Sequence, residues 1–156
     1  AELLERYLHI QKMRFGKRFE FEIQIERSIM EEKIPKLILQ PILENSFHHG
    51  LVNQSGNWIL KVEGEFSARE TGEIGVLILT VTDNGGGIAK ERLMEIQKNL
   101  NKETKSALNA GAHIGLGNVN ARIKLMYPEG NYGVFIDSVE GMGTTVTIKM
   151  EAGIEI

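Results

Sequence analysis

A strand that leads one carboxylate into a run of glycines constrains this chain more than any other feature. Residues 75–81 are aliphatic and β-branched, as is typical of a buried strand. The strand leads to Asp83, and three consecutive glycines follow at 85–87. An Asn-Gly pair after a strand is a strong hairpin signal, but residues 90–100 carry apolar side chains at helical spacing instead of a second strand. The pattern therefore predicts a strand, a glycine-rich turn and a helix.

The glycine-rich turn has two interpretations. Backbone without side chains allows a flat ligand to lie against it, so the turn is a candidate ligand site. A purely structural turn fits the same residues, and other parts of the chain are needed to separate the two.

The rest of the chain completes one α+β domain, because 156 residues are enough for a single sizeable core and no internal repeat is present. Residues 26–33 are expected to form a charged connection. Period-two and β-branched patterns predict strands at residues 19–25, 58–66, 75–81, 132–137 and 144–150. Helical periodicity predicts helices at residues 2–15, 35–50, 90–100 and after Asn118. In the first of these, Leu3, Tyr7 and Ile10 are expected to flank the buried stripe.

Composition excludes several functional classes. The net charge of -3 argues against a nucleic-acid partner. The absence of cysteine excludes disulfides and thiolate zinc sites and is compatible with a cytoplasmic location. No apolar run reaches transmembrane length, and no signal peptide is visible. Because the chain starts within a helical pattern, we expect it to be a fragment of a longer protein.

The helix expected at 35–50 carries an unusual polar face. Glu44, Asn45, His48 and His49 share the arc opposite the apolar residues, since positions i, i+1, i+4 and i+5 are neighbours on a helix. An acid, an amide and two imidazoles can bind metal or phosphate oxygens, although a solvated face is the simpler alternative. A zinc pair is not expected, because adjacent histidines on a helix do not converge on one ion.

A second glycine motif precedes the last helix. Gly115 and Gly117 lead to Asn118, which is a good N-cap, and a helix N-terminus offers free N–H groups to a phosphate. One Gly-x-Gly is neither the dinucleotide fingerprint nor a Walker motif. The preceding loop at 101–113 is long and lacks a clear period, so we expect a mobile lid.

Taken in order, these motifs resemble the asparagine box and glycine boxes of the ATPase superfamily that includes gyrase, Hsp90, MutL and sensor histidine kinases. The segments 7–15 and 39–45 are similar to the YesM/LytS type of bacterial sensor histidine kinase. The resemblance implies a Bergerat fold, a two-layer α/β sandwich with a mixed, mostly antiparallel sheet, helices on one face, and ATP between helix and lid. The matching motifs are Glu44-Asn45 with His49-Gly50, Asp83-x-Gly85-x-Gly87, Gly115-x-Gly117 and Gly141-x-Gly143-Thr144.

For the base of ATP, the resemblance implies five contact residues. Asp83 would accept a hydrogen bond from the adenine amine and so select adenine over guanine. Gly85, Gly87 and Ile88 would let the backbone approach the base. Thr144 would support the base through a water molecule.

For the phosphates, the resemblance implies that Asn45 coordinates Mg²⁺ and that Glu44 orients a metal-bound water or acts as a base. Mg²⁺ prefers oxygen ligands and keeps waters, so one amide oxygen is adequate. His48, where lysine is common in the family, and His49 would contact phosphate. The remaining phosphate contacts would come from Gly115, Leu116, Gly117 and Asn118.

The resemblance also implies a place in a larger protein. Residues 1–16 would be a helix that links an upstream dimerisation and phosphoacceptor segment to a catalytic domain at 17–156. The histidines of this chain lack the Asn-Pro-His-Phe context of an acceptor: His9, His48, His49 and His113. The full-length protein would then be a membrane-anchored homodimer with this domain in the cytoplasm and a response regulator as partner.

Three alternatives remain open. A gyrase, Hsp90 or MutL-type ATPase normally has an acid one turn before Asn45, where this chain has Pro41. An anti-sigma serine kinase shares the boxes but not the N-terminal Tyr-Leu-x-Ile-Gln segment. A degenerate domain that binds partners without chemistry would be distinguished by a nucleotide titration.

Overall fold

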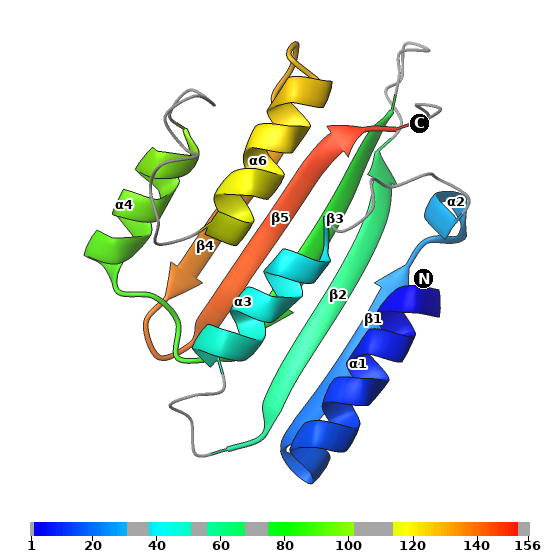
Figure 1. The fold of residues 1–156 in the computed structure, drawn as a ribbon, viewed down its shortest axis with the longest axis vertical. Coiled ribbons are helices and arrows are strands. Elements are labelled where there is room, and N and C mark those ends of the chain that lie inside the picture. Colours follow the sequence, from blue (N-terminus) through cyan, green and yellow to red (C-terminus); the bar gives the residue numbers. More distant parts are fainter. Residues whose placement is uncertain (1, 31–37, 51–55, 68–74, 102–113, 153–156) are drawn as a thin grey trace.

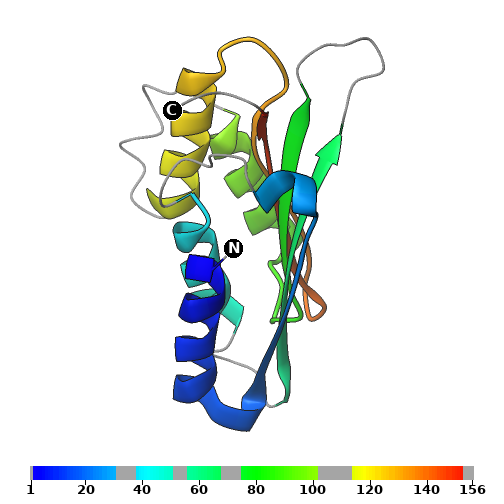
Figure 2. The same cartoon turned by 90° about the vertical axis from the view of Figure 1, so that its right-hand side faces the viewer.

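The computed structural model describes residues 2–30, 38–50, 56–67, 75–101 and 114–152. Over these residues the chain is a two-layer sandwich, with helices on one face of a five-stranded sheet (Figures 1 and 2). The strands are β1 (Phe19–Ile25), β2 (Trp58–Ser67), β3 (Val76–Asp83), β4 (Gly133–Val139) and β5 (Gly143–Glu151). The helices are α1 (Glu2–Phe15), α2 (Arg27–Met30), α3 (Gln40–Gly50), α4 (Lys90–Leu100) and α6 (Ile114–Met126), and the 3₁₀ turn η1 (Gly16–Arg18) follows α1.

The sheet is mixed, as expected, and has the strand order β1-β2-β3-β5-β4. Only β1 and β2 pair in parallel, while the other three neighbouring pairs are antiparallel. Parallel strands need a long crossover, and α2 and α3 lie in the segment between β1 and β2. The predicted fold class is therefore confirmed.

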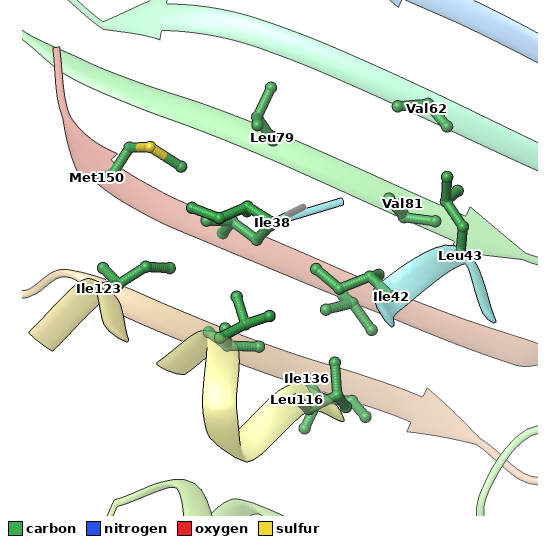
Figure 3. Packing of buried hydrophobic residues seen from close by; sticks show 14 of the residues in the cluster. Ile38, Ile42, Leu43, Val62, Leu79, Val81, Leu116, Ile123, Ile136 and Met150 are labelled. Atoms are coloured by element: carbon green, nitrogen blue, oxygen red, sulfur yellow. The ribbon is translucent and has the colours of Figure 1, made fainter. Parts of the chain in front are cut away.

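The core lies between the sheet and the helices. Along β3 every second side chain faces the helices and is buried, and this alternation ends at Asp83. Figure 3 shows Ile42 of α3 and Leu116 of α6 directed toward the strands, close to Val81 and Ile136. A carboxylate thus occupies the last position of a buried apolar row.

The strand at 19–25, the helix at 90–100 and the hairpin of β4 and β5 are confirmed. The expected charged connection instead contains the short helix α2. Of the residues expected to flank the α1 stripe, Tyr7 packs against the core, but Leu3 and Ile10 were predicted wrongly, because they are 81% and 57% exposed.

Two helix starts were also predicted wrongly. Helix α3 begins at Gln40, not Pro35, and Pro41 therefore lies in the first turn, where its missing N–H costs no helix bond. Helix α6 begins at Ile114, so Asn118 lies inside the helix and is not its N-cap. Glycine weakens a helix by only about 1 kcal/mol, whereas burial of Leu116 between the two glycines contributes about 1.5–3 kcal/mol. Most of the expected lid, residues 102–113, lies outside the described residues.

Candidate functional site

Three polar side chains form a row across the end of the sheet. Asp83 of β3 is the register partner of Thr144 in β5, and Thr144 is in turn the partner of Ser138 in β4. Directly opposed residues of neighbouring strands project from the same face. All three side chains therefore lie on the helix-covered face, beyond the apolar core.

Asp83 is 6% exposed, which makes it one of the few buried acids or amides in the described structure. The backbone N–H of Gly85 donates to its Oδ1 at 2.9 Å. A buried carboxylate requires hydrogen-bond donors, since an unpaired charge is costly to desolvate. The glycine-rich turn thus supplies a hydrogen-bond donor to the buried side chain of Asp83.

Hydrogen bonds from Asn84 connect the same turn to β2 and the residue before it. Its Oδ1 accepts from Ile59 N at 2.7 Å, and its Nδ2 donates to Asn57 O at 3.0 Å. The backbone N–H of Asn84 also donates to Ile59 O. The Asn-Gly pair therefore anchors the end of β3 and does not form a two-residue hairpin.

The turn also packs against the hairpin of β4 and β5. Gly87 has φ +64°, and a Cβ at this position would lie 2.0 Å from the carbonyl oxygen of Val139. Gly141 N donates to Gly86 O at 2.7 Å, and Ile88 N donates to Ser138 Oγ at 2.9 Å. The glycine at 87 is thus required by contact within the protein, whether or not a ligand is present.

Other glycines of the sequence motifs differ in the space that a Cβ atom would have. Gly143 has φ +127°, and a Cβ there would lie 2.0 Å from Asp83 O, so the fold requires it as well. Gly86 and Gly117 have open space where a Cβ would stand. Their small size has no explanation in the packing of the described residues, which leaves room for a ligand.

At the other end of the site, α3 meets the start of α6. A Cβ on Gly115 would lie 3.2 Å from Pro41 Cβ and 3.8 Å from Asn45 Nδ2. Asn45 is half-buried, and its Nδ2 is buried without a hydrogen-bond partner among the described residues. An unpaired buried amide next to a helix N-terminus is suited to a polar ligand.

The residues around Gly117 differ in what they can offer. Leu116 is 3% exposed and belongs to the core, so only its backbone can face a ligand. Asn118 is exposed near the start of α6. Within the first turn of a helix, free N–H groups and the dipole favour an anion.

Glu44 and His48 face a different neighbour from Asn45. They border a groove of about 580 Å³ between α1 and α3, and Gln40 Nε2 donates to Glu44 Oε1 at 2.9 Å. Residues i and i+4 lie on the same side of a helix, as Glu44 and His48 do, whereas adjacent residues such as Glu44 and Asn45 are separated by about 100° around its axis. The groove is lined by Tyr7, Gln11, Arg14, Phe15, Arg18, Glu44, Phe47 and His48.

An aromatic cluster joins α1 to α3 and the sheet below the groove. The Phe47 ring lies 6.1 Å from Tyr7, 5.8 Å from Phe15, 5.2 Å from Phe19 and 4.9 Å from Trp58, between ring centroids. Burial raises the pKa of Tyr7 above its usual value, and the Glu44 carboxylate adds to the rise. Helix α1 is therefore packed against the helix that carries Asn45.

Sequence reasoning missed Ser138 and the groove residues of α1. The signal for Ser138 was present, because its parity along β4 places it on the same face as the buried Val134 and Ile136. The side chain of His49 lies outside the described residues. Among the residues that the structure describes, no cluster of metal-binding acids or histidines occurs, and no helix is long and apolar enough to cross a membrane.

The side chains that the structure describes at this site offer Mg²⁺ one protein ligand, Asn45. Asn45 offers one neutral side-chain oxygen, a hard ligand of the type Mg²⁺ accepts. Because Mg²⁺ retains waters and takes further oxygens from phosphates, an all-protein cage of acids is not needed. The residues are thus compatible with a metal that arrives with a phosphate ligand.

Comparisons with known proteins agree with this arrangement. Residues 30–154 match the family model described as histidine kinase-, DNA gyrase B-, and HSP90-like ATPase. Over all 156 residues the chain is 29% identical to the sensor histidine kinase YesM of Bacillus subtilis, and over 148 residues, 94% of the chain, it is 26% identical to the sensor protein kinase HptS of Staphylococcus aureus. The chain spans 24% and 26% of these relatives, about a quarter of their length.

Among solved structures, the mycobacterial sensor histidine kinase MprB superposes with a TM-score of 0.57 at 15% identity. The superposition covers 97% of this chain and 93% of that one. At this level of identity the likeness supports the fold alone.

Proposed function

Because the chain belongs to the family of histidine kinase-, DNA gyrase B- and HSP90-like ATPases, we propose that it is the ATP-binding catalytic domain of a sensor histidine kinase. In this role it transfers the γ-phosphoryl group of ATP to a histidine on another domain. A P–N bond forms to the imidazole, the P–O bond to the β-phosphate breaks, and ADP leaves.

The observation that carries the proposal is the extent of the similarity to sensor kinases. The family model begins at residue 30, whereas the alignment with YesM covers the whole chain. The shared region therefore includes α1, which packs on α3 through Phe47. Similarity outside the common ATPase core favours a sensor kinase over a gyrase, Hsp90 or MutL-type ATPase.

For the base, we propose that Asp83 accepts from the adenine amine while Gly85, Gly87 and Ile88 form the backbone surface beside it. The burial of Asp83 supports this role, because a hydrogen bond to a charge is stronger away from water. Thr144 lies next to Asp83 in the register and completes the base site.

For the phosphates, we propose that Asn45 holds Mg²⁺ and that Gly115, Leu116 and Gly117 present the N-terminal turn of α6, with the exposed side chain of Asn118 beside it. The unpaired Nδ2 of Asn45 supports a phosphate nearby, because it can donate only to an acceptor such as a phosphate oxygen, while Oδ1 is the atom offered to Mg²⁺. The open space at Gly117 supports the approach of a phosphate to α6. When bound, Mg²⁺ neutralises phosphate charge, and catalysis otherwise consists of positioning.

Glu44 and His48 then lie on the groove side of the same helix, where an acceptor imidazole could approach. We propose that Glu44 takes a proton from that imidazole or orients it. His49 remains a proposed phosphate contact, and His48 would make such a contact from the groove side of α3. The acceptor domain, a response regulator, a homodimeric full-length protein and a membrane anchor are further proposals of the same type.

The test is a binding and transfer assay on the 156-residue chain. We expect Mg-ATP to bind, N45A to lose the part of the affinity that depends on Mg²⁺, and N131A, which changes an exposed asparagine, to bind normally. With radiolabelled ATP, no label should remain on the chain alone. A histidine-containing acceptor domain of a sensor kinase should be labelled slowly, because mixing in trans lacks the roughly millimolar effective concentration of a tethered domain.

Three outcomes would contradict the proposal. A chain that binds no ATP has a different function. Acid-labile label on the isolated chain would make one of its own histidines the acceptor. Tight ATP binding without transfer to any supplied acceptor would favour a degenerate nucleotide-binding module.

A further inference from the structure

We infer that Ser138 fixes the direction of the Thr144 hydroxyl and thereby helps to select a 6-amino over a 6-oxo purine. This inference rests on the proposed nucleotide site. Ser138 acts here as a positioning residue, since it stands one strand beyond Thr144 in the row that starts at Asp83.

The hydrogen bonds around Ser138 use its whole capacity. A hydroxyl has one donor and two acceptor positions. The Ser138 hydroxyl donates to Gly143 O at 2.7 Å, because a carbonyl can only accept, and it accepts from Ile88 N at 2.9 Å. One acceptor position then remains for Thr144 Oγ1, which lies 2.9 Å away.

The direction of the bond between the two hydroxyls follows from this count. The single proton of Ser138 is committed to Gly143 O, so Thr144 must donate to Ser138 Oγ. The Thr144 hydroxyl therefore has no proton left for a ligand. It presents only lone pairs on the side of Asp83.

Asp83 and Thr144 then form a pair of acceptors on neighbouring strands. Directly opposed Cβ atoms lie about 4.5–5.5 Å apart, so both groups can face one edge of a bound base or a water bridging to it. An adenine edge brings an amine that donates to acceptors. At position 6 a hypoxanthine or guanine edge brings a carbonyl oxygen, which such a pair repels when both acceptors face that position and not the neighbouring N1–H, which is a donor.

The test compares ATP with inosine triphosphate, in which a carbonyl replaces the 6-amino group. In calorimetric titrations of the 156-residue chain, we expect S138A to reduce the preference for ATP by about three- to tenfold, because the freed Thr144 hydroxyl can rotate and donate to the carbonyl. S138T, which keeps the hydroxyl, should retain most of the preference. T144V should also reduce the preference, and S138A should then have no further effect in the T144V background.

The matched control is T145V. Thr145 follows Thr144 directly but lies on the opposite face of the sheet, where its hydroxyl is 3.3 Å from that of Thr82. Its loss should leave the preference for ATP unchanged. Circular dichroism of each variant checks that it is folded.

The alternative is that Ser138 only stabilises the turn. In that case S138A weakens the binding of both nucleotides equally. An unchanged ratio of the affinities for ATP and inosine triphosphate would therefore overturn the inference. If S138A does not fold, T144V decides, because an unchanged ratio in that variant has the same meaning. A wild-type chain that binds no ATP refutes the proposed function instead, so the two failures are distinct.

Discussion

Asp83 and Thr144 lie directly opposite each other on β3 and β5, with both side chains on the helix-covered face of the sheet. They are 61 positions apart in the sequence. The antiparallel pairing brings a buried acceptor and a hydroxyl together at one end of the sheet, directly beneath the glycine-rich turn.

The carboxylate of Asp83 is expected to dominate recognition of the base. D83N should weaken ATP binding by roughly ten- to more than a hundredfold, since a hydrogen bond to a charged group contributes about 1.5–3 kcal/mol. Calorimetry measures the change, and D137N serves as the control because Asp137 is exposed on β4. Unchanged ATP affinity in D83N would refute the assignment of Asp83.

Gly87 and Gly86 provide a matched pair for backbone effects. G87A should lower the free energy of unfolding by at least about 1–2 kcal/mol, because the residue has φ +64° and its Cβ would meet Val139 O. G86A should be nearly neutral, since no atom lies within 4 Å of its Cβ. Urea denaturation of both variants measures the difference, and equal losses would contradict this account.

At Gly117, stability and binding are expected to change in opposite directions. G117A should stabilise the chain by up to about 1 kcal/mol, because alanine is the better helix former and its Cβ meets open space. The same methyl group should weaken ATP binding if phosphate approaches this backbone. A variant that is more stable but binds ATP normally would show that phosphate does not lie against Gly117.

Phe47 is expected to hold α3 between α1 and the sheet. F47A should lower the free energy of unfolding by about 3–5 kcal/mol, as is usual when a buried aromatic ring is removed. The fluorescence of Trp58, the only tryptophan, reports on this site because the two rings lie 4.9 Å apart. L125A, at a side chain that is 73% exposed, should stay within about 0.5 kcal/mol of wild type.

Two tyrosines should make stability fall in alkaline solution. Burial raises the pKa of Tyr7, with Glu44 adding to the effect, and burial together with Glu151 raises the pKa of Tyr127. The unfolded chain then loses these protons first, at pH about 10, so stability present below that pH is lost as pH rises further. In urea titrations between pH 8 and 11, the double variant Y7F/Y127F should lose less stability than wild type. An identical pH dependence of stability in the double variant and wild type would contradict the raised pKa values of the two tyrosines.

The sequence alone determined the elements and the family-like order of the motifs. The alternation of apolar and charged residues along 19–25 and the helical spacing along 90–100 were strong signals of secondary structure. Each pattern repeats over a whole element and reports on one buried face. Asp83 could be singled out for a related reason, since a strand with every second residue buried ends on a carboxylate.

Tertiary structure decided what local patterns do not contain. The start of α6 was misjudged because burial of Leu116 offsets the cost of the two glycines, and no local signal reports that burial. Likewise, the need for glycine at 87 comes from Val139 O, and the direction of the Thr144 hydroxyl comes from Ser138. The contact at Gly87 joins segments about fifty residues apart, whereas Ser138 and Thr144 belong to one hairpin, and the site forms only when the sheet register brings β3, β5 and β4 side by side.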